Sequence, residues 1–320
     1  MGSFTSGATC VGRTFAMNSP VESAAWQVSG REVHVSHLTK LYWPEVGVSK
    51  GDLLRYYLAI ASVAMPHFRD RPATMRVFPE GVLGPSFYQR DRPEHAPDWL
   101  RTVNYHPKTT KKSSHVSILT LIDDAAGLIW LANAGSIEFH LWSARLPDLS
   151  RPDQAIFDLD PGAVASFVDV CQAALRLREA LVRDGMRSYP KSSGGRGLHV
   201  YMPLAPEHTF EQVRAWVKSV AERLAAADPE LLAVAHGPTH RGNRITVDYA
   251  QNSVGSNTAA PYTVRAQRTY PVVSTPVRWE EIEAGVDPSA FTPQVVLERV
   301  RQHGDLFAPA SKGGQHLPQM

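Results

Sequence analysis

Residues 154–161 read QAIFDLDP, and this stretch decides how the rest of the chain can be arranged. Apolar side chains alternate with Asp158 and Asp160, which is typical of a strand that buries one face. Pro161 and Gly162 follow at once and predict the end of the strand. The two carboxylates project from one face about 6–7 Å apart, because a strand rises about 3.3 Å per residue.

Three further stretches alternate in the same way: residues 136–142 (SIEFHLW), 198–204 (LHVYMPL) and 244–250 (RITVDYA). A solvated face would carry Thr, Lys, Glu and Ser at the polar positions. The four stretches instead carry side chains suited to chemistry: His140, Asp158, Asp160, His199, Arg244 and Asp248. The pattern therefore indicates a chemical surface.

Long helices are expected over residues 162–183 and about 209–226, between these strands. The first helix is expected to bury an apolar stripe of Val164, Phe167, Val168, Cys171, Leu175 and Val182. Strands separated by such helices indicate a β-α-β type of sheet with helices on one face, in an α+β protein.

The N-terminal part shows weaker signals. Residues 49–52 (SKGD) form a capping box that predicts a helix ending at Pro66. Short strands are expected at residues 73–78, 86–90 and 115–121. Residues 1–25 are expected to be disordered and residues 309–320 to be a flexible tail.

Composition excludes several classes of protein. The chain has 320 residues, 43% of them hydrophobic and 20% charged, as in an ordinary globular protein. Cys10 and Cys171 are the only cysteines, so a disulfide framework is excluded and a reduced cytosolic location is expected. No apolar run approaches the roughly 20 residues of a membrane span, and the N-terminus lacks a secretory signal pattern.

The net charge of +2 is unevenly distributed. Residues 31–112 hold 13 Lys or Arg against 8 Asp or Glu, and residues 236–270 hold four Arg and one acid, Asp248. Basic stretches around an acidic pair are expected of a protein that binds a polyanion through metal-binding carboxylates. A solvated surface with uneven charge is the alternative.

The carboxylates Asp158, Asp160 and Asp248 predict a site for two divalent ions. Paired acids are costly to keep ionised without a cation, and Mg²⁺ or Mn²⁺ binds carboxylates together with phosphates. Three aspartates around two ions suit phosphoryl transfer on nucleotides. A plain strand end is the alternative for D-x-D alone, and a metal-dependent nuclease would also fit it. Zinc is not expected, because Gly237 and Pro238 separate His236 from His240.

Residues 191–197 (KSSGGRG) form a glycine-rich loop that leads into a strand. Such a loop can offer backbone N–H groups, a hydroxyl and a guanidinium to an anion. It is not a Walker loop, because G-x-x-x-x-G-K-[ST] is absent. A tight hairpin is the alternative.

Three ordered motifs resemble those of the archaeo-eukaryotic primase superfamily: residues 158–161 (DLDP), 193–199 (SGGRGLH) and 244–252 (RITVDYAQN). Within that superfamily, residues 33–307 most resemble the polymerase domain of bacterial DNA ligase D and its stand-alone relatives. The resemblance implies one catalytic unit over residues 26–308. It also implies an RRM-like sheet packed against a second α/β module.

The resemblance assigns roles residue by residue. Asp158, Asp160 and Asp248 would be catalytic and would hold the two ions. The implied nucleotide-binding residues are Arg76, Tyr88, His140, Ser193, Arg196, His199, Arg241 and Gln251. The implied DNA-binding residues are Lys40 and Lys50 at a 5′-phosphate, Phe87 beside Tyr88 in base stacking, Lys108, Lys111, Lys112 and Arg265. Two positions depart from the family, since Arg196 replaces a common Lys and Tyr88 a usual Phe.

The implied activity is primer extension and short gap filling at 5′-phosphorylated DNA, in break or excision repair. The implied cofactors are two Mn²⁺ or Mg²⁺ ions, with NTPs favoured over dNTPs as substrates. Implied partners are DNA with Ku and a separate ligase, in a bacterial cytoplasm at the nucleoid, without a membrane. The alternatives are a dedicated primase and a non-catalytic module that binds DNA ends, although the latter would be expected to lose a carboxylate.

Overall fold

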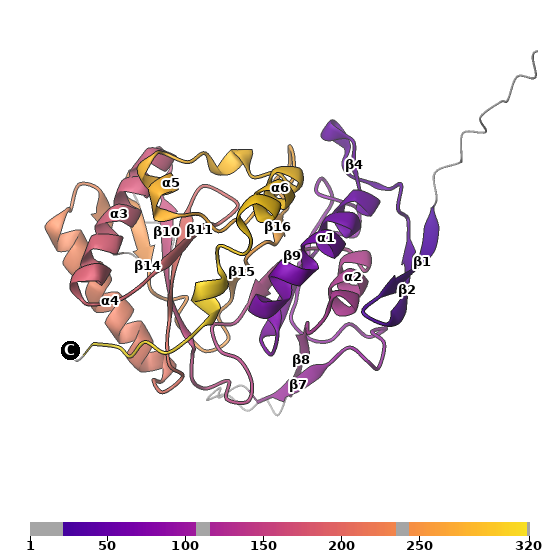
Figure 1. Ribbon diagram of the computed structural model, residues 1–320, viewed down its shortest axis with the longest axis horizontal. Coiled ribbons are helices and arrows are strands. Elements are labelled where there is room, and N and C mark those ends of the chain that lie inside the picture. Colours follow the sequence, from indigo (N-terminus) through magenta and orange to yellow (C-terminus); the bar gives the residue numbers. More distant parts are fainter. Residues whose placement is uncertain (1–21, 107–115, 235–242, 319–320) are drawn as a thin grey trace, which may run out of the picture.

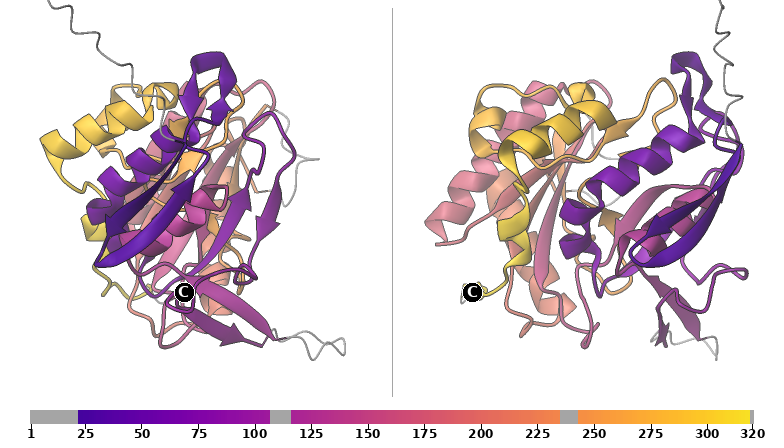
Figure 2. Two further views of the ribbon diagram at one scale, coloured as in Figure 1. Left: turned by 90° about the vertical axis from the view of Figure 1, so that its right-hand side faces the viewer. Right: turned by 45° about the vertical axis from the view of Figure 1, so that its right-hand side comes forward.

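The computed structural model describes residues 22–106, 116–234 and 243–318. Two β-sheets lie beside each other, each with its own helices (Figure 1). The hairpin of β1 (Ser23–Val28) and β2 (Arg31–Ser36) lies at the end of the molecule opposite α4 (Figures 1 and 2). No helix in the described ranges is long and apolar enough to cross a membrane.

The five-stranded sheet has the order β11-β12-β10-β14-β13, and every neighbouring pair except β13–β14 is antiparallel. Its strands are β10 (Gln154–Pro161), β11 (Tyr189–Ser192), β12 (Leu198–Pro203), β13 (Leu232–Ala233) and β14 (Ile245–Asp248). With α3 (Phe167–Arg183) after β10 and α4 (Phe210–Ala227) after β12, the strands β10, β11, β12 and β14 follow β-α-β-β-α-β order, and the two-residue strand β13 is added at the edge beside β14. This is the split βαβ topology of RRM domains, and it confirms the predicted sheet.

Both helices cover the apolar face of this sheet. Capping boxes at Ser166 and Thr209 start α3 and α4. Trp216 of α4 packs edge-on against Phe157, with ring centroids 5.9 Å apart. The helix expected from residue 162 begins at Phe167 instead, because the residues before it form a turn. The acidic residues of β10 therefore lie on the face that the helices leave open.

The apolar stripe expected for α3 is confirmed in part, because Cys171 is buried and Phe167 and Leu175 pack against the core. Val164, Val168 and Val182 are exposed. The helix instead buries mainly small side chains together with Val170, Leu177 and Leu181. The sheet beneath it accepts a close helix, so alanines make the contact.

The six-stranded sheet has the order β15-β9-β5-β8-β7, and β6 pairs with β5 at one side. Its strands are β5 (Pro72–Val77), β6 (Phe87–Gln89), β7 (Thr102–Tyr105), β8 (Ser117–Leu121), β9 (Ser136–Leu141) and β15 (Thr258–Ala259). The strand that carries His140 thus belongs to a different sheet from the three other alternating strands. The two sheets are joined at β15, where the hydroxyls of Thr258 and Tyr201 lie 2.6 Å apart.

The second module is completed by α1 (Lys50–Phe68) and α2 (Ala125–Asn133), which pack together. Ser49 and Asp52 form the predicted capping box of α1. The helix continues through Pro66 rather than ending there, which corrects the prediction. Pro66 lies in the last turn, so its missing N–H removes one bond without breaking the body of the helix.

The remaining elements connect the modules: β3 (Leu41–Trp43), β4 (Val48–Ser49), β16 (Val264–Arg265), β17 (Val272–Val273), α5 (Trp279–Glu283), α6 (Pro293–His303) and the short 3-10 helices η1 (Pro44–Val46), η3 (Pro288–Ala290) and η4 (Ala308–Ser311). The predicted limits of the disordered N-terminal segment, residues 1–25, and of the flexible tail, residues 309–320, both need correction. Residue 23 already starts β1, and Gln315 donates to the carbonyls of Arg187 and Pro203 at 2.9 and 3.0 Å. Residues 309–318 are thus bound to the module that contains the five-stranded sheet.

Candidate active site

The strand register brings the three predicted carboxylates together. Asp158 of β10 lies opposite Asp248 of β14 on one side and His199 of β12 on the other. Asp160 lies opposite Thr246. All of these residues share the face that turns away from α3 and α4, as the alternation predicts.

Asp158 is in an environment that disfavours its own charge. It is 8% exposed, and within the described residues its Oδ1 has no hydrogen-bond partner. Nε2 of His199 lies 3.4 Å from this oxygen. Burial, and then the charges of Asp160 and Asp248, raise the pKa of Asp158 well above its usual range. An unpartnered buried carboxylate beside two others is what a divalent cation would neutralise.

The carboxylates offer only part of a coordination shell. In the described parts of the chain, no three acidic, histidine or cysteine side chains are close enough to enclose an ion. Mg²⁺ and Mn²⁺ commonly take a few carboxylates and complete their shell with water and substrate phosphates. The residues present therefore fit a metal that arrives with a nucleotide better than a closed structural site.

The segment after β14 is held in place by Asn252. Its side chain accepts from the N–H of Ile156 at 2.9 Å and donates to the carbonyl of the same residue at 2.7 Å. Asp248 Oδ1 accepts from the N–H of Ala250 at 2.7 Å. These bonds fix the turn that carries Gln251 into the cavity beside Asp158.

The glycine-rich loop folds back on Ser193. The hydroxyl of Ser193 accepts from the N–H groups of Gly195 and Gly197, each at 3.2 Å. These two amides are thus satisfied inside the loop, contrary to the expectation that they face an anion. A Cβ at Gly197 would lie 2.5 Å from the carbonyl oxygen of Leu159, so the loop can approach β10 this closely only with glycine.

Arg196 is directed away from the carboxylates. Its guanidinium donates to the carbonyls of Gly162, Ala163 and Ala165 at 3.0, 3.2 and 2.8 Å. These bonds tie the Arg196 side chain to the turn before α3, and Arg196 does not line the cavity beside Asp158. Its predicted nucleotide contact would require these bonds to be exchanged.

A cavity of about 360 Å³ lies between the two sheets, and Asp158 is on its wall. Five of the predicted nucleotide- or DNA-binding residues line it as well: Tyr88, His140, His199, Gln251 and Arg265. Thr74, Arg90, Asn257 and Thr258 also line it, and sequence reasoning missed them. Their positions depend on the second sheet, for which no motif gave a signal.

Sequence reasoning also missed Glu138, which is 1% exposed. Its carboxylate accepts from Arg76, His140 and Arg265 and from the N–H of Ala266, at 3.0–3.3 Å. Burial alone would raise its pKa, but the hydrogen bond from His140 and the charge of Arg265 lower the pKa of Glu138 to about 2. The alternation of β9 was a usable signal, since it placed Glu138 on the same face as His140.

Lys191 is a second missed residue, and it is fully buried. Its Nζ lies 3.0 Å from Nδ1 of His199 and donates to Oγ of Ser274 at 2.6 Å. Burial and then nearby positive charge lower the pKa values of both Lys191 and His199 well below their usual ranges. Lys191 thus contacts Nδ1 of the His199 imidazole, and Nε2 of the same ring faces Asp158.

Phe87 and Tyr88 lie on β6 and are 51% and 60% exposed, and Tyr88 lines the cavity. Tyr88 stacks edge-on against His140, with centroids 5.8 Å apart, and Arg76 lies 5.7 Å from the Tyr88 ring. Exposed aromatic rings can stack on bases, and the stacking role of Phe87 and Tyr88 stays a prediction.

Lys40 and Lys50 are brought together by the pairing of β3 with β4, because one precedes the first strand and the other follows the second. The N–H of Lys50 donates to the carbonyl of Lys40 at 2.8 Å. The Lys40 ammonium donates to Glu80 and to the carbonyl of Pro79, both at 2.8 Å. Burial, and then the charge of Lys40, lower the pKa of Lys50 to about 8, against an opposing effect of Glu22.

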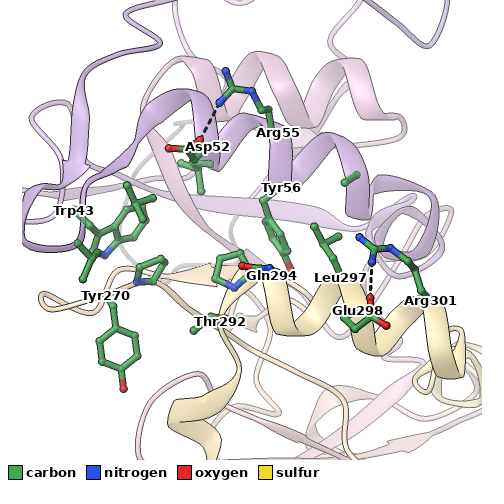
Figure 3. A pocket seen from close by; sticks show the side chains of 16 residues that line it. Trp43, Asp52, Arg55, Tyr56, Tyr270, Thr292, Gln294, Leu297, Glu298 and Arg301 are labelled. Atoms are coloured by element: carbon green, nitrogen blue, oxygen red, sulfur yellow. Dashed lines mark hydrogen bonds and ion pairs between the residues drawn. The ribbon is translucent and has the colours of Figure 1, made fainter.

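A larger cavity of about 850 Å³ lies between α1 and α6, away from the carboxylates (Figure 3). Trp43, Tyr56 and Leu297 contribute to its apolar wall. Ion pairs within α1 and within α6, Asp52–Arg55 and Glu298–Arg301, lie on its rim. None of the predicted site residues lines this cavity.

Lys108, Lys111, Lys112 and Arg241 lie outside the described residues. Their predicted contacts therefore stay predictions.

A family model described as "LigD, primase-polymerase domain" matches residues 49–307. The chain belongs to this family. The LigD primase-polymerase family is one of nucleotidyltransferases, so the chain is an enzyme of this type. The recognised motifs, the α+β class and the RRM-like sheet are confirmed by this match and by the topology.

Curated relatives are named LigD as well. The chain is 32% identical over 281 residues to a multifunctional non-homologous end joining protein of Mycolicibacterium smegmatis, covering 87% of this chain and 36% of that protein. It is 29% identical over 288 residues to a bifunctional protein of Bacillus subtilis, covering 90% and 45%. The chain thus spans less than half the length of these relatives.

A solved LigD domain has the same fold. The polymerase domain of Mycobacterium tuberculosis ligase D, in complex with DNA, superposes with a TM-score of 0.81 at 30% identity. The superposition covers 88% of this chain and 99% of that chain. The likeness therefore extends over both modules of the LigD fold described above.

Proposed function

We propose that this domain adds nucleotides to the 3′-end of a primer at 5′-phosphorylated gaps or ends in DNA. The 3′-oxygen attacks the α-phosphorus of the incoming nucleotide and the bond to pyrophosphate breaks. The observation that carries the proposal is the meeting of Asp158, Asp160 and Asp248 on one sheet face, with Asp158 Oδ1 buried and unpartnered among the described residues.

These three aspartates would hold two Mg²⁺ or Mn²⁺ ions. When bound, the ions supply the charge that eases deprotonation of the 3′-hydroxyl and stabilises the transferring phosphate. Burial and the charges of Asp160 and Asp248 raise the pKa of Asp158, and a bound cation would offset the cost of keeping this carboxylate ionised. Nδ1 of His199 contacts Lys191, and Nε2 of the same ring lies 3.4 Å from the Asp158 carboxylate.

The cavity between the sheets is the proposed nucleotide site. Arg265 and Gln251 line it and are suited to bind triphosphate oxygens, because a guanidinium and an amide both donate hydrogen bonds. Tyr88 lines it as well, is exposed and can stack on the base. His140 lies on the wall formed by β9, where it can contact the sugar.

The two lysines beside the start of α1 are the proposed site for the downstream 5′-phosphate. Lys50 lies at the first position of α1, where free N–H groups and the helix dipole favour an anion. Lys40 would exchange its bond to Glu80 for the phosphate. A terminal phosphate carries more charge than a phosphodiester, so such a pocket can discriminate between the two.

We further propose that this chemistry serves non-homologous end joining, the process in the names of the curated relatives. Ku and a DNA ligase are the proposed partners. Both would act on the same broken ends, at the bacterial chromosome.

Primer extension on gapped DNA tests the proposal. Wild type should extend the primer with Mn²⁺ or Mg²⁺, and Asp158→Asn should lose at least about a thousandfold in kcat, the scale of a lost catalytic charge contact. Asp98→Asn is the matched control, because Asp98 is fully exposed and does not line the cavity. Extension by Asp158→Asn at a hundredth of wild type or more, a limit set by about 2.7 kcal/mol, would contradict the carboxylate assignment. Product formed without any primer would instead indicate a dedicated primase.

A further inference from the structure

We infer that Glu138 is a positioning residue that holds the His140 proton on Nε2, so that Nδ1 faces the cavity as a hydrogen-bond acceptor for the sugar hydroxyl of a ribonucleotide. The inference rests on the proposed nucleotide site. It assigns a task to a buried carboxylate that neither binds the ions nor lies on their sheet.

The carboxylate of Glu138 is fully used by four donors. Oε1 accepts from Nη1 of Arg76 at 3.3 Å and from the N–H of Ala266 at 3.0 Å. Oε2 accepts from Nε2 of His140 at 3.0 Å and from Nε of Arg265 at 3.1 Å. Two oxygens with two partners each have filled their in-plane acceptor positions.

An ionised carboxylate fixes the direction of these bonds. With a pKa of about 2, Glu138 is ionised at any pH at which the protein works, and it can then only accept. Nε2 of His140 must therefore carry a proton. Burial lowers the pKa of His140, so the ring is neutral near pH 7 and Nδ1 keeps a lone pair.

Nδ1 of His140 is available to a ligand. Within residues 22–106, 116–234 and 243–318, none of the polar atoms bonds to it, whereas Nε2 is bound by Glu138. The ring is on the cavity wall, between Thr74 of β5 and Ala259 of β15 in the strand register. A lone pair at this place accepts a hydrogen bond from a hydroxyl group.

The consequence is selectivity for the sugar. A ribose hydroxyl donates to Nδ1, while a deoxyribose leaves the buried acceptor without a partner. Glu138 also holds Arg76 and Arg265 on either side, so it positions the charges that would meet the phosphates. Loss of the bonds to Arg76 and Arg265 would lower kcat/KM for ribonucleotides and deoxyribonucleotides alike. Loss of the proton on Nε2 of His140 would instead change the ratio of the two kcat/KM values.

Kinetics separate the two roles. The variant Glu138→Gln keeps the size of the side chain but brings an amide that donates to His140. We expect kcat/KM to fall for both kinds of nucleotide, and the NTP/dNTP ratio to fall from about tenfold in wild type to near one, the ratio expected from loss of one neutral hydrogen bond. Gln251→Ala is the control that weakens phosphate contacts, because Gln251 lines the cavity and is not among the four donors to Glu138. It should leave the ratio within about twofold of wild type on the same scale.

His140→Ala gives the reference value for a site without the acceptor. Its ratio should also be near one, and the double variant Glu138→Gln/His140→Ala should not lower it further. A ratio in Glu138→Gln that stays at the wild-type value would overturn the inference, because a purely structural ion cluster predicts that result.

Nitrogen NMR of the protein without nucleotide tests the same inference without activity. Long-range ¹H–¹⁵N spectra, with His140→Ala to assign the signals, should show the His140 proton on Nε2 in wild type. A proton on Nδ1 would overturn the inference even if Glu138→Gln fails to fold. Absence of any primer extension by wild type would contradict the proposed function and leave this spectroscopic result unaffected.

Discussion

At the scale of single residues, the buried charged side chains of Glu138 and Lys191 are held by partners from other parts of the chain. The aspartates and His199 could be predicted because they share a strand face with a recognisable motif. The alternation of β9 placed Glu138 beside His140, but the roles of Glu138 and Lys191 could not be predicted, because their partners come from other parts of the chain. Arg196 lies in a recognised motif, but its side chain is bound to nearby carbonyls and does not line the cavity beside Asp158.

Lys50 gives a prediction on pH. Its pKa of about 8 means that the free protein loses this positive charge as the pH rises through 8. A terminal phosphate is a dianion above about pH 6, so the attraction should be strongest between these two values. We expect the preference for 5′-phosphorylated over unphosphorylated gapped DNA to weaken by up to about tenfold per pH unit above 8. Binding titrations at roughly pH 7, 8 and 9 measure it.

Lys50→Arg is the control for this titration, because a guanidinium stays charged throughout the range. Its preference for the phosphate should not change with pH. A wild-type preference that is equally flat would show that Lys50 does not contact the phosphate.

At the scale of elements, alternation and capping boxes predicted strands and helix starts well, but not which sheet a strand joins. β9 and β10 have equally clear patterns and lie in different sheets. Strand pairing over a long separation depends on the packing of whole modules, which local periodicity does not encode. The α3 stripe was only partly right for a related reason, since Val164, Val168 and Val182 are exposed while alanines and other apolar side chains of the helix are buried.

The loop between β11 and β12 provides a prediction at this scale. In Gly197→Ala the new Cβ would press on the backbone of Leu159, directly between Asp158 and Asp160. We expect a loss of about 1–3 kcal/mol in the free energy of unfolding, typical of overpacking, together with slower primer extension. Urea unfolding and single-turnover kinetics measure the two effects.

Gly195→Ala is the matched control in the same loop. Its Cβ would meet no heavy atom closer than 3.5 Å. Stability and rate should therefore stay close to wild type. Equal effects of the two alanines would mean that the approach to β10 is not what requires glycine.

At the scale of the whole molecule, a buried ion pair fastens one module to the other. Arg71, just before β5, donates to both oxygens of Asp153, just before β10, at 2.6 and 2.7 Å. Arg71 is almost fully buried. Arg71→Met leaves Asp153 with only Arg145 and should lower the free energy of unfolding by about 3 kcal/mol.

Urea unfolding of Arg71→Met measures this cost. Arg55→Met, which removes an exposed pair with Asp52, should change stability by less than about 1 kcal/mol. Similar midpoints for the two variants would show that the Arg71 pair does not hold the modules together.

The division of the cavity between two sheets has an evolutionary consequence. The aspartates that would drive turnover belong to β10 and β14, while His140, its partner Glu138 and the stacking Tyr88 belong to the other sheet. Substitutions that change which sugar is accepted can thus accumulate in the six-stranded sheet without moving the aspartates of the five-stranded sheet. A lineage can drift between RNA-like and DNA-like products while its chemistry stays intact. Mutagenesis confined to the cavity-lining positions of that sheet, Thr74, Tyr88 and His140, should therefore yield altered sugar choice more often than lost turnover.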